Sequence, residues 1–334
     1  MKHIVKLLLA VSFSFSVTLS AQDFAVTGAL VTVGDGSATM ENATVIIRDG
    51  RISAVGNDLN PPDDIPIMDG TGMWVTPGLV AAITNLGLVD VSAVQASNDI
   101  SAGGSRFNAA LDVAPAINPT SQHILVARTN GITRAVVAPS PSNSIFAGQG
   151  AIIATSGLDN VVMKPRAFQM VNLAERGARI AGGSRTASHV ELRNALREAS
   201  ELTQGEWADQ DNLITQADAL ALTQVLRGEQ PLVVEAHRAS DIRVIISLAQ
   251  EFPRLKIVIF GATEGWLVAS ELAEAKIPVI AESLQALPER FEQMAATQSN
   301  IGRMHPAGVE VSFNASSARF THMFTQYAGN LVAL

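Results

Sequence analysis

The chain has 334 residues, of which 47% are hydrophobic and 16% charged; its formal net charge is −8, and it has no cysteine. This composition excludes a disordered protein, and the absence of cysteine excludes disulfides, thiolate metal ligands and a cysteine nucleophile. Lys and Arg are scattered along the sequence rather than clustered, so the sequence predicts no nucleic-acid partner. The length allows one large barrel or two domains.

Residues 1–21 have the pattern of a secretory signal peptide. Lys2 and Lys6 make a basic start, Leu7 to Leu19 form an apolar run, and Ser20-Ala21 offers a small-residue cleavage site. We therefore expect a periplasmic or secreted protein with a cleaved signal peptide. A membrane anchor is the alternative, but the apolar run is shorter than the roughly 20 residues of a membrane span.

Residues 22–72 have a sequence pattern typical of a small β-sheet. A strand is predicted from Ala25 to Val33, and "ATVIIRDGRISAVG" predicts a hairpin. Its Asp49-Gly50 dipeptide suits a two-residue primed turn. These strands are too few to form a domain alone, so we expect them to be one part of a sheet layer that is completed from elsewhere.

Residues 73–334 alternate short apolar runs with amphipathic helical patterns. The runs include "WVTPGLVAAI", "ITRAVVAPS", "AFQMVNL", "PLVVEAH", "KIVIFGA", "IPVIAES" and "VEVSFNA". About seven such units predict a TIM-like (β/α)8 barrel, with a doubly wound open sheet as the alternative. "GAIIATSG" is either a further strand or a hairpin inserted in a loop. The loops at 91–121 and 140–150 follow predicted strands, so they should lie at the C-terminal face of the barrel.

Several motifs together resemble one family. "VIIRDGRISAVG", "DGTGMWVTPGLV", "EAHRASDI", "ATEGW" and "AGVEVSFNAS" are similar to the amidohydrolase superfamily, in particular to its imidazolonepropionase-like branch. The resemblance implies a metal-dependent TIM-like barrel beside a small β-sandwich built from N- and C-terminal segments. It also implies hydrolysis of non-peptide C–N bonds, often in cyclic amides, with zinc or another divalent metal.

The chain departs from this family at the metal-binding positions. Where the family has an Asp and then a His-x-His pair after the PGL motif, this chain has Ala81, Ile83 and Asn85. A later metal-binding His is replaced by Gly261, and the Asp that binds metal and acts as a base is replaced by Ser316. The resemblance therefore implies a degenerate metal site.

The chain keeps one residue of a type that the family uses as a metal ligand. This residue is His237, and Glu235 lies two residues before it. A catalytic zinc ion needs at least three protein ligands, so we predict no cofactor. A new metal site from His237, His305 and His322 is an alternative. The candidate pocket residues are His237, Glu235, Asn85, Thr84, Glu264 and Ser316.

These observations favour an exported amidohydrolase-family protein with a binding or partner role. An active hydrolase with an unrecognised or metal-independent site, and a periplasmic small-molecule binding protein, are the alternatives. The candidate partners are a small molecule, an active amidohydrolase relative and further copies of this chain. The chain stops inside a helical pattern after "SARFTHMFTQYAGNLVAL", so we expect a fragment without the final helix and the C-terminal β segment.

Overall fold

The computed structural model describes residues 22–157, 160–207, 212–283, 286–314 and 323–333. The expected signal peptide, residues 1–21, lies outside them. The chain divides into two compact units between Pro77 and Gly78 rather than after residue 72, because strand β5 (Trp74–Val75) pairs with the first strand of the chain. In the described part of the chain, no helix is long and apolar enough to cross a membrane.

The first unit is a five-stranded sheet in which β1 (Phe24–Val31) is central. The sheet has the order β3-β2-β1-β4, and β5 also pairs with β1. Its other strands are β2 (Met40–Arg48), β3 (Arg51–Gly56) and β4 (Ile67–Asp69). Asp49 and Gly50 have φ values of 49° and 70°, as a type I′ turn requires, so the predicted hairpin is confirmed.

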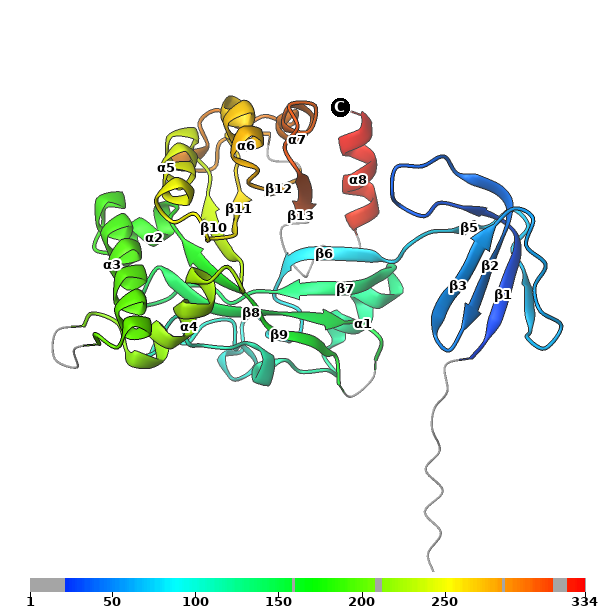
Figure 1. Cartoon of the computed structure of the whole chain (residues 1–334), viewed down its shortest axis with the longest axis horizontal. Coiled ribbons are helices and arrows are strands. Elements are labelled where there is room, and N and C mark those ends of the chain that lie inside the picture. The colour runs from blue at the N-terminus through cyan, green and yellow to red at the C-terminus, as the bar shows by residue number, and fades with distance from the viewer. Residues whose placement is uncertain (1–21, 158–159, 208–211, 284–285, 315–322, 334) are drawn as a thin grey trace, which may run out of the picture. The chain divides into compact units, whose positions relative to one another are not determined.

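The second unit is an eight-stranded, nearly closed barrel, which confirms the predicted barrel over the open sheet (Figure 1). Its sheet has the order β13-β12-β11-β10-β9-β8-β7-β6, and β13 lies beside β6. The strands are β6 (Leu79–Thr84), β7 (Ile132–Val137), β8 (Phe146–Ala154), β9 (Val162–Asn172), β10 (Leu232–Ala236), β11 (Ile257–Gly261), β12 (Val279–Glu282) and β13 (Val311–Asn314).

The barrel is not entirely parallel. Strand β8 pairs antiparallel with both β7 and β9, whereas the other neighbouring pairs in the sheet order are parallel. The "GAIIATSG" run is thus part of a barrel strand, not a hairpin in a loop. The TIM-like barrel departs from strict alternation of strand and helix, because β7, β8 and β9 follow one another without an intervening helix.

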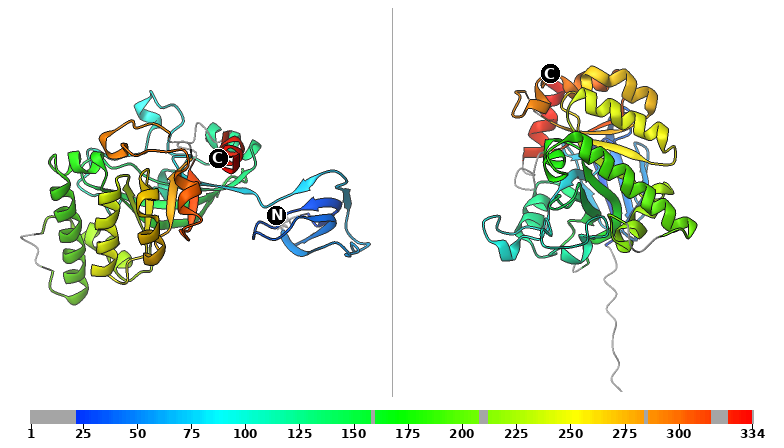
Figure 2. Two further views of the ribbon diagram at one scale, coloured as in Figure 1. Left: turned by 90° about the horizontal axis from the view of Figure 1, so that it is seen from above. Right: turned by 90° about the vertical axis from the view of Figure 1, so that its left-hand side faces the viewer.

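Helices pack against the outer side of the C-terminal half of this sheet, with α3 and α5 side by side (Figures 1 and 2). The α-helices are α1 (Gln122–Thr129), α2 (Glu175–Ile180), α3 (Arg185–Gln204), α4 (Gln216–Leu226), α5 (Ala239–Glu251), α6 (Ala269–Ala275), α7 (Asn300–Met304) and α8 (Phe324–Ala333). Single 3-10 turns lie at Gln95–Ser97, Ala114–Ala116, Gly265–Val268 and Phe291–Gln293.

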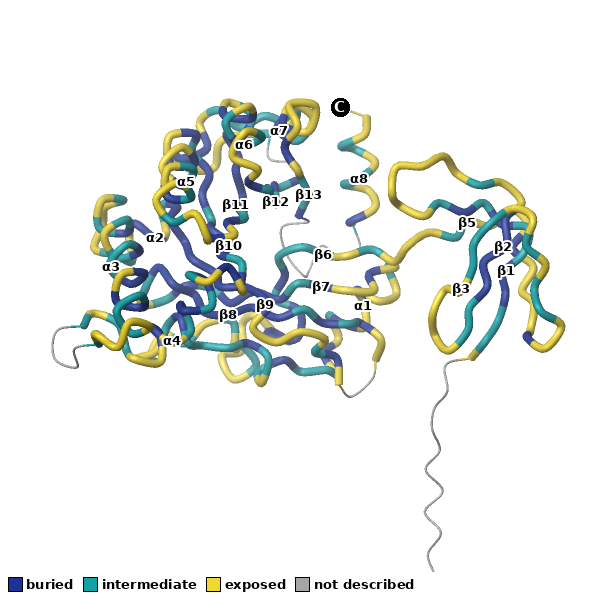
Figure 3. The backbone as a smooth tube through the Cα atoms, viewed as in Figure 1, coloured by how far each residue is buried: buried dark blue, intermediate teal, exposed yellow. Residues whose placement is uncertain are grey.

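The second unit has two main hydrophobic cores outside the barrel, and β8, β10 and β11 are buried along most of their length (Figure 3). One is built from residues between positions 79 and 162. The other joins α3, α4, α5 and α6 to β9, β10, β11 and β12. A third cluster, including Phe168, Met170 and Val233, fills the inside of the barrel, because successive strand residues point to opposite faces.

Candidate functional site at the barrel mouth

The carboxyl ends of the parallel strands surround a pocket of about 180 Å³. Parallel barrels build their sites at this end. Three of the residues expected from the sequence line the pocket together: Thr84, Asn85 and Glu235. The Thr84 hydroxyl donates to the backbone carbonyl of Val136 at 2.9 Å, so it holds β6 against β7.

The floor of the pocket is largely apolar. Ile83, Met170 and Phe260 line it and belong to the cluster that fills the barrel. Ile83 stands where the family resemblance implies a metal-binding histidine. The end of β6 therefore contributes apolar packing surface at the position where the resembled family has a metal ligand.

Glu235 is fixed by the neighbouring strand. The side-chain amide of Asn172, at the end of β9, donates to Glu235 Oε2 at 2.6 Å. The amide oxygen of Asn172 accepts from the N–H groups of Ala174 and Gly177, at 3.1 and 2.8 Å. One asparagine thus orients the Glu235 carboxylate and anchors the start of α2.

His237 is buried immediately beyond β10, and its ring lies over Gly261. Nδ1 of His237 is 2.8 Å from Thr263 Oγ1, and Nε2 is 3.8 Å from Glu235 Oε1. Gly261 has φ +96°, and a Cβ atom placed there would lie 2.6 Å from His237 Cε1. The imidazole therefore occupies the space into which any side chain at position 261 would have to grow.

Acidic neighbours favour the charged form of this imidazole. Burial, the largest single influence, opposes the charge on His237, but Glu235, Glu282 and Glu292 together outweigh it and raise the pKa of His237 above its ordinary 6.5. The gap of 3.8 Å between His237 and Glu235 is longer than a hydrogen bond, so Glu235 acts through its charge. Burial itself raises the pKa of Glu282 above its ordinary value.

We expect the pH dependence of stability to report this arrangement. Because the pKa of His237 is raised on folding, protonation stabilises the folded state fully below pH 6.5, and this contribution is lost as the pH rises through the folded-state pKa. A Glu235→Gln variant should lower the pKa of His237 in an NMR titration, since the main stabilising charge is gone. An unchanged titration would show that Glu235 does not control His237.

The structure places the remaining candidates elsewhere. Glu264 does not line the pocket: its two oxygens accept the N–H groups of Ala239 and Ala295, each at 3.0 Å, so it anchors the start of α5 and a neighbouring loop. Ser316 and His322 lie outside the described residues. His305 is exposed at the end of α7, whereas His237 is buried.

Sequence reasoning missed three polar residues at the mouth: Asn172, Arg176 and Asn314. Arg176 and Asn314 line the pocket, and Arg176 donates to the Pro141 carbonyl at 2.6 Å. Asn172 and Asn314 each end a strand that the sequence does predict, within "AFQMVNL" and "VEVSFNA". Both asparagines could have been predicted as site residues, because polar residues at the carboxyl ends of barrel strands face the site.

Comparison with known proteins supports this architecture. No family model matches the chain. An amidohydrolase from Thermotoga maritima MSB8 has a similar structure, with a TM-score of 0.81 and 24% sequence identity, over 93% of this chain and 83% of that one. A Xaa-Pro dipeptidase with bound methionine matches less well, with a TM-score of 0.52 and 13% identity over 93% and 84% of the two chains.

A sequence match adds to the structural one. Imidazolonepropionase from Agrobacterium fabrum is 39% identical over 56 residues. The match spans 16% of this chain and only 13% of that enzyme. Together these comparisons confirm the resemblance to amidohydrolases, and the fold of this chain is the amidohydrolase fold.

Proposed function

We propose that this chain is an exported amidohydrolase-fold protein whose barrel mouth binds a small organic molecule without a catalytic metal ion. One observation carries the proposal: the His237 ring fills the space beside Gly261, the position at which the resemblance implies a metal-binding histidine. Export is supported by the pattern of residues 1–21 alone.

The donor set of the pocket does not fit a zinc or similar ion. A catalytic zinc site requires three protein ligands from His, Cys, Asp or Glu. Among the described residues, no group of three such side chains could hold a metal ion. Glu235 already accepts from Asn172, and Ile83 and Gly261 offer no donor atom.

The mouth instead suits a neutral ligand with apolar and amide character. Ile83, Met170 and Phe260 offer apolar surface, Asn85 and Asn314 offer amides, and Glu235 and Arg176 contribute charges of opposite sign. The similarity to imidazolonepropionase and to an amidohydrolase structure makes cyclic amides the first ligands to test.

A metal-independent hydrolase is the second candidate. Within the residues that the structure describes, buried Nε2 of His237 has no hydrogen-bond partner, and it lies 3.8 Å from Glu235 Oε1. A His–carboxylate pair can act as a general acid–base system. This candidate requires turnover of a cyclic amide, whereas the binding role requires none.

Metal content and turnover test the proposal together. We expect the purified protein, exchanged into metal-free buffer, to hold far less than one transition-metal ion per chain, and to leave hydantoin unhydrolysed while its melting temperature rises with hydantoin concentration. Stoichiometric zinc would contradict the proposal. Hydrolysis without metal would favour the second candidate.

Substitution of His237 separates binding from catalysis. His237 is buried and does not itself line the pocket, but its Nε2 lies 3.8 Å from Oε1 of Glu235, which does. We expect His237→Ala to weaken hydantoin binding about fivefold through Glu235, because an interaction worth roughly 1 kcal/mol is removed. His305→Ala, on the exposed end of α7, is the matched control and should bind as the wild type does. An unchanged affinity in His237→Ala would exclude a role for this residue in the pocket.

A further inference from the structure

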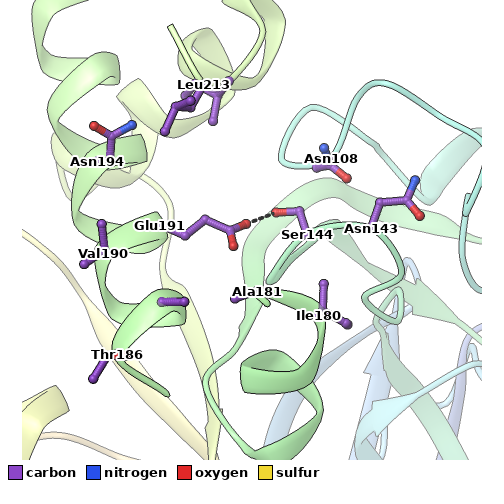
Figure 4. Close-up of a pocket in the computed structure, with 12 residues that line it drawn as sticks. Asn108, Asn143, Ser144, Ile180, Ala181, Thr186, Val190, Glu191, Asn194 and Leu213 are labelled. Carbon is purple, nitrogen blue, oxygen red and sulfur yellow. Dashed lines mark hydrogen bonds between the residues drawn. The ribbon is translucent and has the colours of Figure 1, made fainter. Parts of the chain in front are cut away.

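A second, larger cavity of about 640 Å³ lies in the barrel unit, and it shares no lining residue with the mouth pocket. It is formed between helix α3, the end of α2 and the loops that contain Asn108 and Asn143 (Figure 4). Its volume is in the range of small-molecule sites.

Among the described residues, Glu191 is the one charged residue that lines this cavity. It extends from α3 toward Ser144 (Figure 4). Its Oε1 accepts the Ser144 hydroxyl at 2.6 Å and the N–H of Ile145 at 3.2 Å. Both donors are neutral, and no Lys, Arg or His of the described residues forms an ion pair with Glu191. Within the described part of the chain, the half-buried carboxylate therefore has only neutral hydrogen-bond donors.

The remaining surface of the cavity is mostly aliphatic. Ile180, Ala187, Val190 and Ile214 line it, and Val190 is 65% exposed. The side-chain amide of Asn108 lines it as well and has no hydrogen-bond partner within the described part of the chain. A negative charge, an open amide and an aliphatic wall thus face one space.

We propose that this cavity binds the ammonium group of an aliphatic amine. The ammonium would donate to the Glu191 carboxylate and to the Asn108 amide oxygen, and the alkyl chain would lie against the aliphatic wall. An ammonium offers three donors and no acceptor, and charge-assisted hydrogen bonds to a carboxylate are about twice as strong as neutral ones. A carboxylate or phosphate ligand would be repelled by Glu191.

Isothermal titration of the full chain with n-hexylamine tests the site. Hexylammonium should bind to the wild type, and hexan-1-ol, which has the same chain without the charge, should bind far more weakly. Glu191→Gln should weaken hexylammonium binding about ten- to a hundredfold. Glutamine keeps an oxygen that accepts from Ser144 and Ile145, so the loop should stay in place.

Three further variants make the outcome decisive. Ala187→Trp should abolish binding, because the indole fills the cavity while the Glu191 carboxylate is kept in the chain. Glu271→Gln removes an exposed carboxylate that pairs with Arg243 and should bind as the wild type does. Equal binding of hexylammonium by the wild type and Glu191→Gln would overturn the proposal. Loss of binding in Glu235→Gln alone would also overturn it, because the amine would then lie at the barrel mouth.

Discussion

Replacing Gly261 by alanine is expected to destabilise the protein by about 3 kcal/mol. Two costs add: a non-glycine residue in the left-handed region costs roughly 1–2 kcal/mol, and overpacking a filled site costs typically 1–3 kcal/mol. Both apply here, because Gly261 has φ +96° and its Cβ would lie 2.6 Å from His237 Cε1. Urea denaturation followed by circular dichroism measures the change.

A double variant separates the two costs. In a His237→Ala background the steric part should vanish, so Gly261→Ala should cost only the roughly 1–2 kcal/mol of backbone strain. Gly104→Ala is the control, since no atom lies within 4 Å of that site, and it should leave stability unchanged. Equal destabilisation by Gly261→Ala in both backgrounds would mean that the His237 ring does not occupy this space.

Replacing Arg185 by leucine should be at least as damaging. Arg185 bonds Asp241 and Glu292, each at 2.9 Å, and the side chains of these acids are 5% and 0% exposed. Glu292 also exchanges hydrogen bonds with Glu175, because each carboxylate accepts the backbone N–H of the other. Without Arg185, Asp241 keeps Arg238 at 2.6 Å, but among the described residues the nearest cation to the fully buried Glu292 is Arg290 at 3.8 Å. Breaking a buried ion pair typically costs about 3–5 kcal/mol.

Arg193→Leu on the same helix is the matched control. Arg193 pairs with Glu251 at 2.9 Å, but the two side chains are 36% and 44% exposed. Exposed ion pairs contribute about 0–1 kcal/mol, so this variant should unfold at nearly the denaturant concentration of the wild type. Similar losses in the two variants would show that burial does not determine the value of the Arg185 contacts.

The sequence predicts the barrel well because its strands are continuous apolar runs separated by amphipathic helices. It does not predict that β8 runs antiparallel, since periodicity carries no information on strand direction. The Asp49-Gly50 hairpin was predictable, because one dipeptide fixes the turn chemistry.

The candidate site was only partly predictable. The positions of Asn85 and Glu235 at strand ends were enough to predict them as pocket residues. The same reasoning selected Glu264, which instead accepts hydrogen bonds from backbone N–H groups. The position of the His237 ring over Gly261 depends on Thr263 and Glu235, which reach it from different strands or loops. Such a side-chain conformation is set by tertiary neighbours that local sequence does not reveal.

The two separate cores of the barrel unit have a consequence for folding order. The core built from residues between positions 79 and 162 needs no residue from the later part of the chain, and contacts at smaller sequence separation cost less loop-closure entropy. This half can therefore collapse on the ribosome before α3 to α6 are synthesised, leaving β9 to join the halves, since it pairs with β8 on one side and β10 on the other. Pulse-labelled hydrogen exchange should then find amides of β6 and β7 protected before those of β11 and β12.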